Sequence, residues 1–261
     1  MVGRPYYFDD NVMLYNMDCL AFMKKLEMEI FDLTVTSPPY NIGKEYEKIQ
    51  KPEDYLNWCE RWMHFVFDVT VENGTFWLNL GYFKLRNGNA VPIAYLLWDK
   101  TNFYFMQEII WYYKAGVSAK KYFSPRNEKY LWYVKNQLDY KFNLDIIRDP
   151  DVKYPNQKKN GKLKCNPIGK NPTNVWDIPK VTSGKNRSSK ERVDHPAQFP
   201  LAVLERIIKA SSDKYDLIFD PFIVSGSVAV SGIQHGRKVV GCDVNTDYLD
   251  IAIERIEKLD V

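Results

Sequence analysis

Three short apolar runs, each ending abruptly in a turn or at an acidic residue, constrain the fold more than any other feature. They cover residues 31–36, 215–219 and 238–242. None of them alternates between apolar and polar positions, which is typical of parallel strands covered on both faces. Weaker runs predict further strands at residues 75–80, 108–113 and 130–134.

Helical patterns separate these runs along the chain. Apolar residues recur with helical spacing over residues 54–71, 200–210 and 247–259, as they do in helices that cover a sheet with one face. Strands that alternate with helices predict an α/β fold with a doubly wound, mostly parallel sheet. In such a sheet, ligands bind at the carboxyl ends of the strands.

Length and composition limit the class of protein. The chain has 261 residues, of which 45% are apolar, so we expect a single domain, residues 1–261, with a substantial core. No apolar run reaches the roughly 18 residues of a membrane helix, and residues 1–10 lack the apolar core expected of a signal peptide. The four cysteines lie far apart without a Cys-x-x-Cys pair, which argues against disulfides or a metal site and predicts a cytoplasmic protein.

The formal charge of +3 hides a strong asymmetry. Residues 152–193 contain eleven basic and two acidic residues, a net charge of +9 that leaves −6 on the rest of the chain. The segment is rich in Asn, Gly, Pro and Ser and has no regular period, so it predicts long loops. A charge run of this kind is commonly a solvated insertion. The interleaved aromatic residues Tyr154 and Trp176 favour instead a surface that contacts phosphates and bases.

We therefore predict that residues 139–193 are a basic insert that recognises a nucleic-acid target. The side chains expected to contact DNA are Lys158, Lys159, Lys162, Lys164, Lys185 and Arg187.

The turn after the second apolar run has the position of a nucleotide site. Residues 220–227 form this turn, and Asp243 ends the following strand. An acid placed there faces the same crevice as the turn and can bind both hydroxyls of a ribose. The turn lacks a Gly-Lys-Ser/Thr triplet and has few glycines, so a nucleoside without a phosphate fits better than a dinucleotide. The alternative is that Asp243 is only a turn residue.

A Ser-Pro-Pro-Tyr turn follows the first apolar run. The two prolines fix the backbone and leave carbonyl oxygens without local donors. The Ser37 hydroxyl and the Pro38 carbonyl can accept hydrogen bonds from an exocyclic amine, while Tyr40 stacks on the ring that carries it. Such acceptors would draw the nitrogen toward sp³ geometry and restore its lone pair to an electrophile. The alternative is an ordinary tight turn with Tyr40 on the surface.

These motifs together resemble those of the β group of DNA amino-methyltransferases, which methylate N4 of cytosine or N6 of adenine. Residues 36–41 (Thr-Ser-Pro-Pro-Tyr-Asn) resemble the catalytic motif of the family, and residues 219–227 resemble its cofactor motif. Residues 195–201 and 16–20 are similar to its other cofactor segments. A catalytic motif that precedes the cofactor motif is the circularly permuted order of the β group. The resemblance spans nearly the whole chain.

The resemblance implies roles for particular residues. The target amine would be bound and activated by Ser37, Pro38, Pro39 and Tyr40. S-adenosyl-L-methionine would be bound by Asp18, Cys19, Phe199, Pro200, Asp220, Pro221, Phe222, Val224, Ser225, Gly226 and Asp243.

It also implies a substrate and partners. A base in duplex DNA must be flipped out to reach such a turn, so the substrate would be double-stranded DNA. Ser37 stands where adenine-modifying relatives more often have Asp, which favours N4 of cytosine over N6 of adenine. A companion restriction endonuclease would act on the same site without a stable complex, and the methyltransferase would be a monomer or weak dimer.

One position departs from the family pattern. The cofactor motif usually reads Phe-x-Gly-x-Gly, whereas this chain has Val224 at the first glycine position. Glycine permits a backbone conformation that a β-branched side chain resists. We expect either a rebuilt turn or impaired cofactor binding, and the latter would suit a catalytically impaired DNA-binding relative.

Overall fold

A computed structural model describes residues 2–44, 47–84, 90–116, 118–181, 191–193 and 198–259. One nine-stranded sheet forms its centre, and two small hairpins lie outside this sheet. The strands of the sheet are β1 Tyr7–Phe8, β2 Val12–Asn16, β3 Phe31–Thr36, β4 Thr70–Leu80, β7 Tyr104–Tyr112, β8 Asn127–Val134, β11 Val175–Asp177, β12 Leu217–Asp220 and β13 Lys238–Asp243. The hairpins are β5 Tyr82–Lys84 with β6 Ala90–Pro92, and β9 Lys158–Lys159 with β10 Lys162–Leu163.

The sheet has the strand order β1-β2-β13-β12-β3-β4-β8-β7-β11. Strands β2, β13, β12, β3 and β4 run parallel to one another. Strand β8 is antiparallel to both of its neighbours, and β11 is parallel to β7. The prediction of a mostly parallel α/β sheet is therefore confirmed, and all six predicted strands are present.

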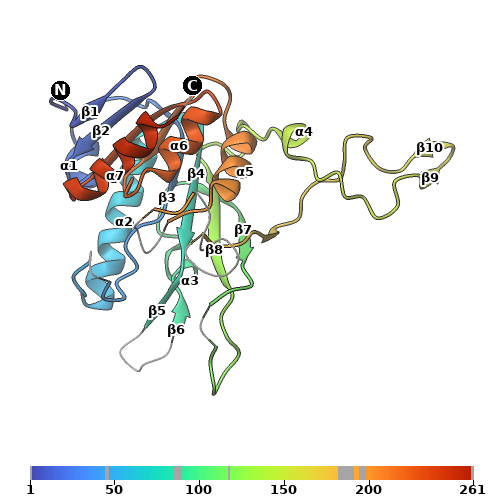
Figure 1. Ribbon diagram of the computed structural model, residues 1–261, viewed down its shortest axis with the longest axis horizontal. Coiled ribbons are helices and arrows are strands. Elements are labelled where there is room, and N and C mark those ends of the chain that lie inside the picture. The colour runs from blue at the N-terminus through green and yellow to red at the C-terminus, as the bar shows by residue number, and fades with distance from the viewer. Residues whose placement is uncertain are drawn as a thin grey trace.

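Helices cover both faces of the sheet. Helices α5, α6 and α7 pack in series on one face, where Figure 1 shows them side by side in orange and red. Helices α1, α2 and α3 belong to the core on the other face. The helices are α1 Cys19–Met23, α2 Pro52–Val69, α3 Ala94–Leu97, α4 Leu144–Ile147, α5 Leu201–Ser211, α6 Ser227–Gln234 and α7 Thr246–Glu257.

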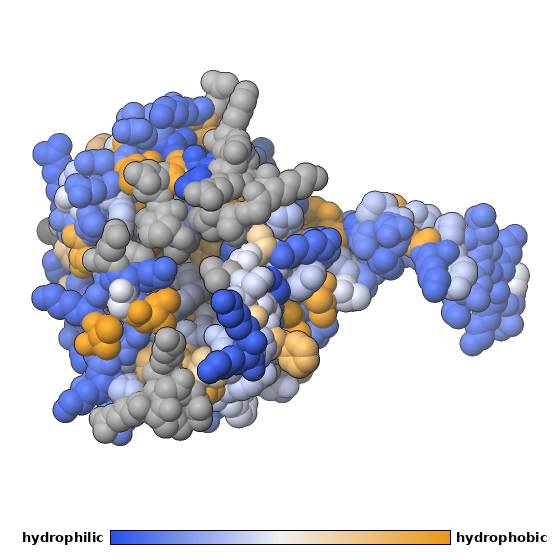
Figure 2. All heavy atoms as spheres, turned by 60° about the horizontal axis from the view of Figure 1, so that its bottom comes forward, coloured by the Kyte–Doolittle hydropathy of each residue, from blue (hydrophilic) through white to orange (hydrophobic). Residues whose placement is uncertain are grey.

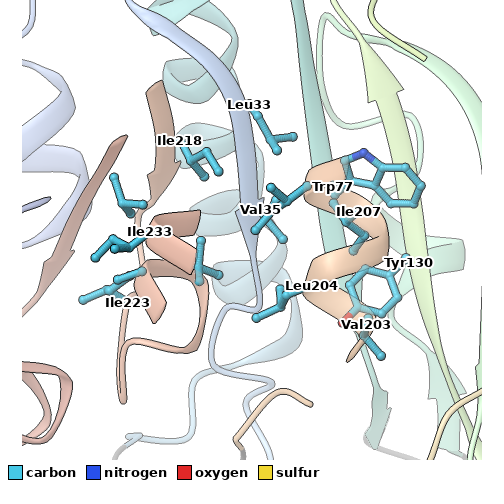
Figure 3. Close-up of a cluster of buried hydrophobic side chains, with 14 of the residues drawn as sticks. Leu33, Val35, Trp77, Tyr130, Val203, Leu204, Ile207, Ile218, Ile223 and Ile233 are labelled. Carbon is cyan, nitrogen blue, oxygen red and sulfur yellow. The ribbon is translucent and has the colours of Figure 1, made fainter. Parts of the chain in front are cut away.

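Successive strand residues point into two separate cores. Trp77 and Ile218 pack toward α5–α7, whereas their neighbours Phe76 and Phe219 pack toward α1 and α2. Figure 3 shows the first core, in which α5 lays its apolar side chains against β3 and β4. Burial on both faces is the reason that these strands read as unbroken apolar runs.

The chain leaves the adjacent strands β3 and β12 in opposite directions. From β3 it passes through α2 to β4, and from β12 it passes through α6 to β13 on the other face. Leu33 pairs with Ile218 in this central ladder. The point where two parallel strands diverge in this way opens a crevice at their carboxyl ends, which is where open α/β sheets bind ligands.

Part of the basic segment projects from the body as an arm. A bridge between Asp149 and Lys170 closes its base, and the β9–β10 hairpin forms its end. Asn160 and Gly161 turn the hairpin with φ of +52° and +76°. Figure 1 shows the arm extending far from the sheet, and in Figure 2 its surface is mostly hydrophilic. Among the described residues of the segment 152–193 the predicted loops are present, but three short strands, β9, β10 and β11, interrupt them.

The prediction that Trp176 belongs to a nucleic-acid surface is wrong. Trp176 lies in β11, which adds to the sheet beside β7, and its side chain is only 5% exposed. It packs between Trp77 and Tyr130, with ring centroids 5.9 and 6.2 Å away. Tyr154, by contrast, is exposed on the arm. In the part of the chain that the structure describes, no helix has the length and apolar character needed to span a membrane.

Candidate active site

A cleft of about 820 Å³ lies at the carboxyl ends of the central strands. Its walls combine the two motifs that the sequence separates by about 180 residues: the Ser-Pro-Pro-Tyr turn after β3 and the turn after β12. The Thr36 hydroxyl donates a 2.6 Å hydrogen bond to Oδ1 of Asp220, which ties the two strand ends together. All of the predicted catalytic residues and most of the predicted cofactor residues thus face a common space.

Asp220 is a buried acid at the base of the cleft. Besides the bond from Thr36, its Oδ1 accepts a hydrogen bond from the Phe222 N–H at 3.1 Å. Burial, with a smaller contribution from the nearby Asp243 carboxylate, raises the pKa of Asp220 to about 7 against the lowering effect of the two hydrogen bonds. Desolvation disfavours the charged form of a carboxyl group, so Asp220 holds a proton over much of the acidic range.

Val224 has the left-handed backbone conformation expected of a glycine, with φ of +46°. The turn is therefore not rebuilt around the valine. Its N–H donates to Oδ2 of Asp243 at 3.1 Å, and the N–H of Asn245 donates to Oδ1 of the same carboxylate at 2.9 Å. Asp243 thus lines the cleft and also anchors the turn. Burial raises the pKa of Asp243.

The next turn residues are held from behind by α7. Gly226 has φ of +70°, and a Cβ there would lie 2.6 Å from the Cβ of Ala252, so glycine is required twice over. Arg255 donates to the Ser225 carbonyl at 2.5 Å and to the Ser227 hydroxyl at 3.0 Å. Arg255 was not predicted from the sequence, in which it is one more charged residue of an amphipathic helix.

The remaining cofactor candidates divide into two groups. Asp18, Cys19 and Phe199 line the cleft together with Pro221, Phe222 and Ser225. Asp18 also caps α1, because its Oδ1 accepts the N–H of Ala21 at 3.0 Å. Pro200 and Gly226 do not line the cleft: Pro200 precedes α5 as its N-cap, and Gly226 faces Ala252. These two residues shape the backbone of the site.

The Ser-Pro-Pro-Tyr turn presents its polar groups to the other end of the cleft. The hydroxyls of Ser37 and Tyr40 lie 2.8 Å apart, and the Tyr40 hydroxyl donates to Oδ1 of Asn79 at 2.7 Å. The ring of Tyr40 packs so closely on Gly81 that a Cβ there would lie 2.7 Å from Cε2. Pro38 and Pro39 line the same wall. Burial raises the pKa of Tyr40 well above its usual value, so its hydroxyl keeps its proton.

Beyond this turn, the cleft contains an ion pair that sequence reasoning missed. Lys180 Nζ donates to Oε1 of Glu128 at 2.6 Å and lies 3.9 Å from the ring centroid of Tyr113. All three residues line the cleft, as does Trp111. Asn79 and Glu128 carry no local signal in the sequence. They reach the cleft because β4 ends, and the antiparallel β8 begins, at the same edge of the sheet.

The predicted DNA-contacting lysines lie elsewhere. Lys158, Lys159, Lys162 and Lys164 are exposed on the arm, and none of them lines the cleft. The arm holds six of the eleven basic residues of the segment 152–193, and none of these six lines the cleft. Lys185 and Arg187 lie outside the described residues.

Comparison with known proteins agrees with this arrangement. The DNA methylase family of N6 and N4 amino-methyltransferases matches residues 31–254. The chain is 59% identical over 257 residues to the type II methyltransferase M.ScaI of Streptomyces caespitosus, covering 98% of this chain and 84% of that protein. It is 32% identical to the DNA adenine methyltransferase YhdJ of Escherichia coli, covering 92% and 81%.

Solved structures share the fold at lower identity. The PvuII cytosine-N4-specific DNA methyltransferase superposes with a TM-score of 0.75 at 17% identity, over 99% of this chain and 90% of that one. Family match, close relatives and the site at the carboxyl edge of the sheet agree, and the chain therefore belongs to the N6/N4 DNA methylase family of restriction-modification amino-methyltransferases.

Proposed function

We propose that the protein transfers a methyl group from S-adenosyl-L-methionine to the exocyclic N4 amine of a flipped-out cytosine in double-stranded DNA. The observation that carries this proposal is that the turn after β12 and the Ser-Pro-Pro-Tyr turn line one cleft. A cofactor and an amine bound at its two ends would share a single space from which water can be excluded, and bringing two reactants together in this way is a large part of catalysis.

The residues at one end of the cleft suit S-adenosyl-L-methionine. Asp18 and Asp243 offer carboxylates. The turn from Asp220 to Ser227 offers backbone groups and itself contains no lysine that would favour a phosphate. The structurally similar M1.HpyAVI was crystallised as a complex with this cofactor, and its chain superposes with a TM-score of 0.62 at 19% identity. The cofactor supplies a methyl group on a positively charged sulfur. The protein needs only to hold and orient it.

The other end of the cleft suits an aromatic amine. The Ser37 hydroxyl and the Pro38 carbonyl would accept hydrogen bonds from the two amine hydrogens. The amine nitrogen then regains lone-pair density that is otherwise delocalised into the ring. Tyr40 holds the Ser37 hydroxyl in place through the 2.8 Å contact between the two hydroxyl oxygens, and its ring would form part of the cleft wall beside the base. No covalent enzyme intermediate is needed.

Ser37 favours cytosine N4 as the target, and the cytosine-N4-specific PvuII enzyme shares the fold. Adenine N6 is the second candidate, because YhdJ, an adenine methyltransferase, is 32% identical. Incubating the purified protein with labelled S-adenosyl-L-methionine and mixed DNA, then identifying the methylated nucleoside by mass spectrometry, tests both. N4-methylcytosine supports the proposal. N6-methyladenine overturns its choice of base, and no labelled nucleoside overturns methyl transfer itself.

We assign target recognition to the basic arm within residues 139–193. Four lysines gather near its hairpin, on a projection that extends away from the sheet (Figure 1) and could contact a DNA backbone while the cleft engages the base. Removing lysines that neutralise phosphates should reduce the salt dependence of DNA affinity, because fewer counterions are then released on binding. The test replaces Lys158, Lys159, Lys162 and Lys164 together by Gln. The affinity should fall and the slope of affinity against salt should flatten.

The control is Lys238→Gln, since Lys238 is exposed at the amino end of β13, whereas the cleft lies at the carboxyl ends of the parallel strands. Unchanged affinity and salt slope in the arm variant would remove the arm from recognition.

We further infer a companion restriction endonuclease that acts on the same site without a stable complex, as the type II relative M.ScaI suggests. The methyltransferase itself is inferred to be a monomer or weak dimer. Light scattering across a range of protein concentrations tests this last point, and a concentration-independent oligomer would contradict it.

A further inference from the structure

The loop between β7 and β8 leaves and rejoins the body at the rim of the cleft. Trp111 and Tyr113 line the cleft just before the loop, and Glu128 lines it just after. In Figure 1 the loop, in green, extends well beyond the end of the sheet, away from helices α5–α7. A large substrate that reaches into the cleft would therefore lie close to the two ends of this loop.

The tip of the loop combines two aromatic with two basic side chains. Lys120, Lys121, Tyr122 and Phe123 are all exposed, Phe123 fully (100%) and Tyr122 to 74%. Behind them, the Ala119 N–H donates to the Ser124 hydroxyl at 2.8 Å, which closes the loop and holds these four residues at its end.

Neighbouring exposed aromatics are unfavourable in water, and apolar groups displayed beside a binding cleft mark an interaction site. The two lysines restrict the chemistry of the partner, because they complement a polyanion. Proteins that distort duplex DNA insert apolar side chains between base steps, with basic residues on the flanking phosphates. Phe123 and Tyr122, next to two lysines at the tip of a loop whose two ends line the cleft, have the composition of such a wedge.

We infer that the tip of the β7–β8 loop is a DNA wedge. Phe123, supported by Tyr122, enters the base stack next to the target nucleotide and occupies the space that this nucleotide leaves when it turns into the cleft. Lys120 and Lys121 contact the phosphates on either side. This inference rests on the proposed function, and it separates two tasks: the arm supplies affinity, whereas the wedge lowers the cost of flipping.

The test uses the full chain and two duplexes. The first is an oligonucleotide duplex that carries the position methylated by the wild-type protein. The second lacks the base opposite that position, so its target leaves the stack more easily. Phe123→Ala should methylate the intact duplex about tenfold more slowly than the wild type, equivalent to about 1.4 kcal/mol of barrier. On the second duplex its rate should return to within about twofold of the wild-type rate.

Phe8→Ala is the matched control, because Phe8 is 66% exposed on β1, which is the outermost strand on the side of the sheet away from β7 and β8. It should match the wild type on both duplexes, and S-adenosyl-L-methionine affinity should be the same in all three proteins. A wild-type rate for Phe123→Ala on the intact duplex would overturn the wedge, and it is the result expected if the loop binds a protein partner instead. An equal loss of rate on both duplexes would overturn the wedge as well. If the wild-type protein methylates no DNA, the proposed function fails, and the wedge fails with it.

Discussion

Replacing Val224 by glycine should make the protein more stable. Val224 holds φ of +46°, and a left-handed conformation costs a residue with a Cβ about 1–2 kcal/mol, with β-branched residues at the upper end. Glycine removes this strain, but the greater freedom of the unfolded chain costs about 0.5–1 kcal/mol. The side chain is only half-buried, so little packing is lost. The free energy of unfolding should rise by about 1 kcal/mol, or about 2–4 °C in Tm for a chain of this size.

Cofactor affinity should change in the same direction. Val224 lines the cleft, and its N–H is bonded to Asp243, so a ligand bound at Asp243 would come close to the backbone of this turn. Glycine permits that approach. We expect Val224→Gly to bind S-adenosyl-L-methionine more tightly in a calorimetric titration, and equal or weaker affinity would contradict this.

A matched substitution separates strain from the general effect of glycine. Val244 also lines the cleft and is 70% exposed, but it is not among the residues with positive φ. Val244→Gly therefore carries the unfolded-state cost without any relief of strain, and its Tm should fall. If differential scanning calorimetry shows that both variants lose stability equally, the backbone of Val224 is not strained and the reasoning is refuted.

Three further outcomes follow from the site. Burial raises the pKa of Asp220 to about 7 from an ordinary value of 3.8, so its contribution to stability is complete below about pH 4 and is lost as the pH rises through 7. Between pH 5 and 8, the free energy of unfolding measured with denaturant should fall by about 2–3 kcal/mol more in the wild type than in Asp220→Asn. Parallel pH dependences of the two proteins would contradict this. Arg255→Gln removes the hydrogen-bond donors to Ser225 and Ser227, so calorimetric titration should show about tenfold weaker cofactor binding. The kcat at saturating cofactor should stay near the wild-type value. Unchanged cofactor affinity would show that α7 does not position the turn. Ser37→Ala should lower the single-turnover rate of methylation by about tenfold to a hundredfold and leave cofactor affinity intact. A wild-type rate in Ser37→Ala, together with a reduced rate in Tyr40→Ala, would assign amine activation to Tyr40 alone.

Much of the fold, and the place of the turn after β12 in the cleft, was predictable from local sequence. The run Phe31–Thr36 is β3 with the same bounds, and the last two predicted strands differ from β12 and β13 by no more than two residues at either end. These strands are covered on both faces, so their apolar character is continuous and easily read. The departure at Val224 could be interpreted because a turn conformation is a property of a few consecutive residues, and the structure keeps that conformation.

The order of strands across the sheet was decided only by the tertiary structure, and with it the content of the cleft. Asn79, Glu128 and Lys180 are far apart in sequence and meet there because β4, β8 and the segment after β11 place their ends on one edge. Trp176 was misread for the same reason: strand pairing at a sheet edge buried a side chain that its basic neighbours suggested was exposed. Conversely, Phe123 is apolar yet fully exposed. The sequence by itself determined the six predicted strands, the helices α2, α5 and α7 and the two motifs, which depend on near neighbours. The burial of each side chain and the residues that it contacts depend on segments that are distant in the sequence, and only the folded chain brings these segments together.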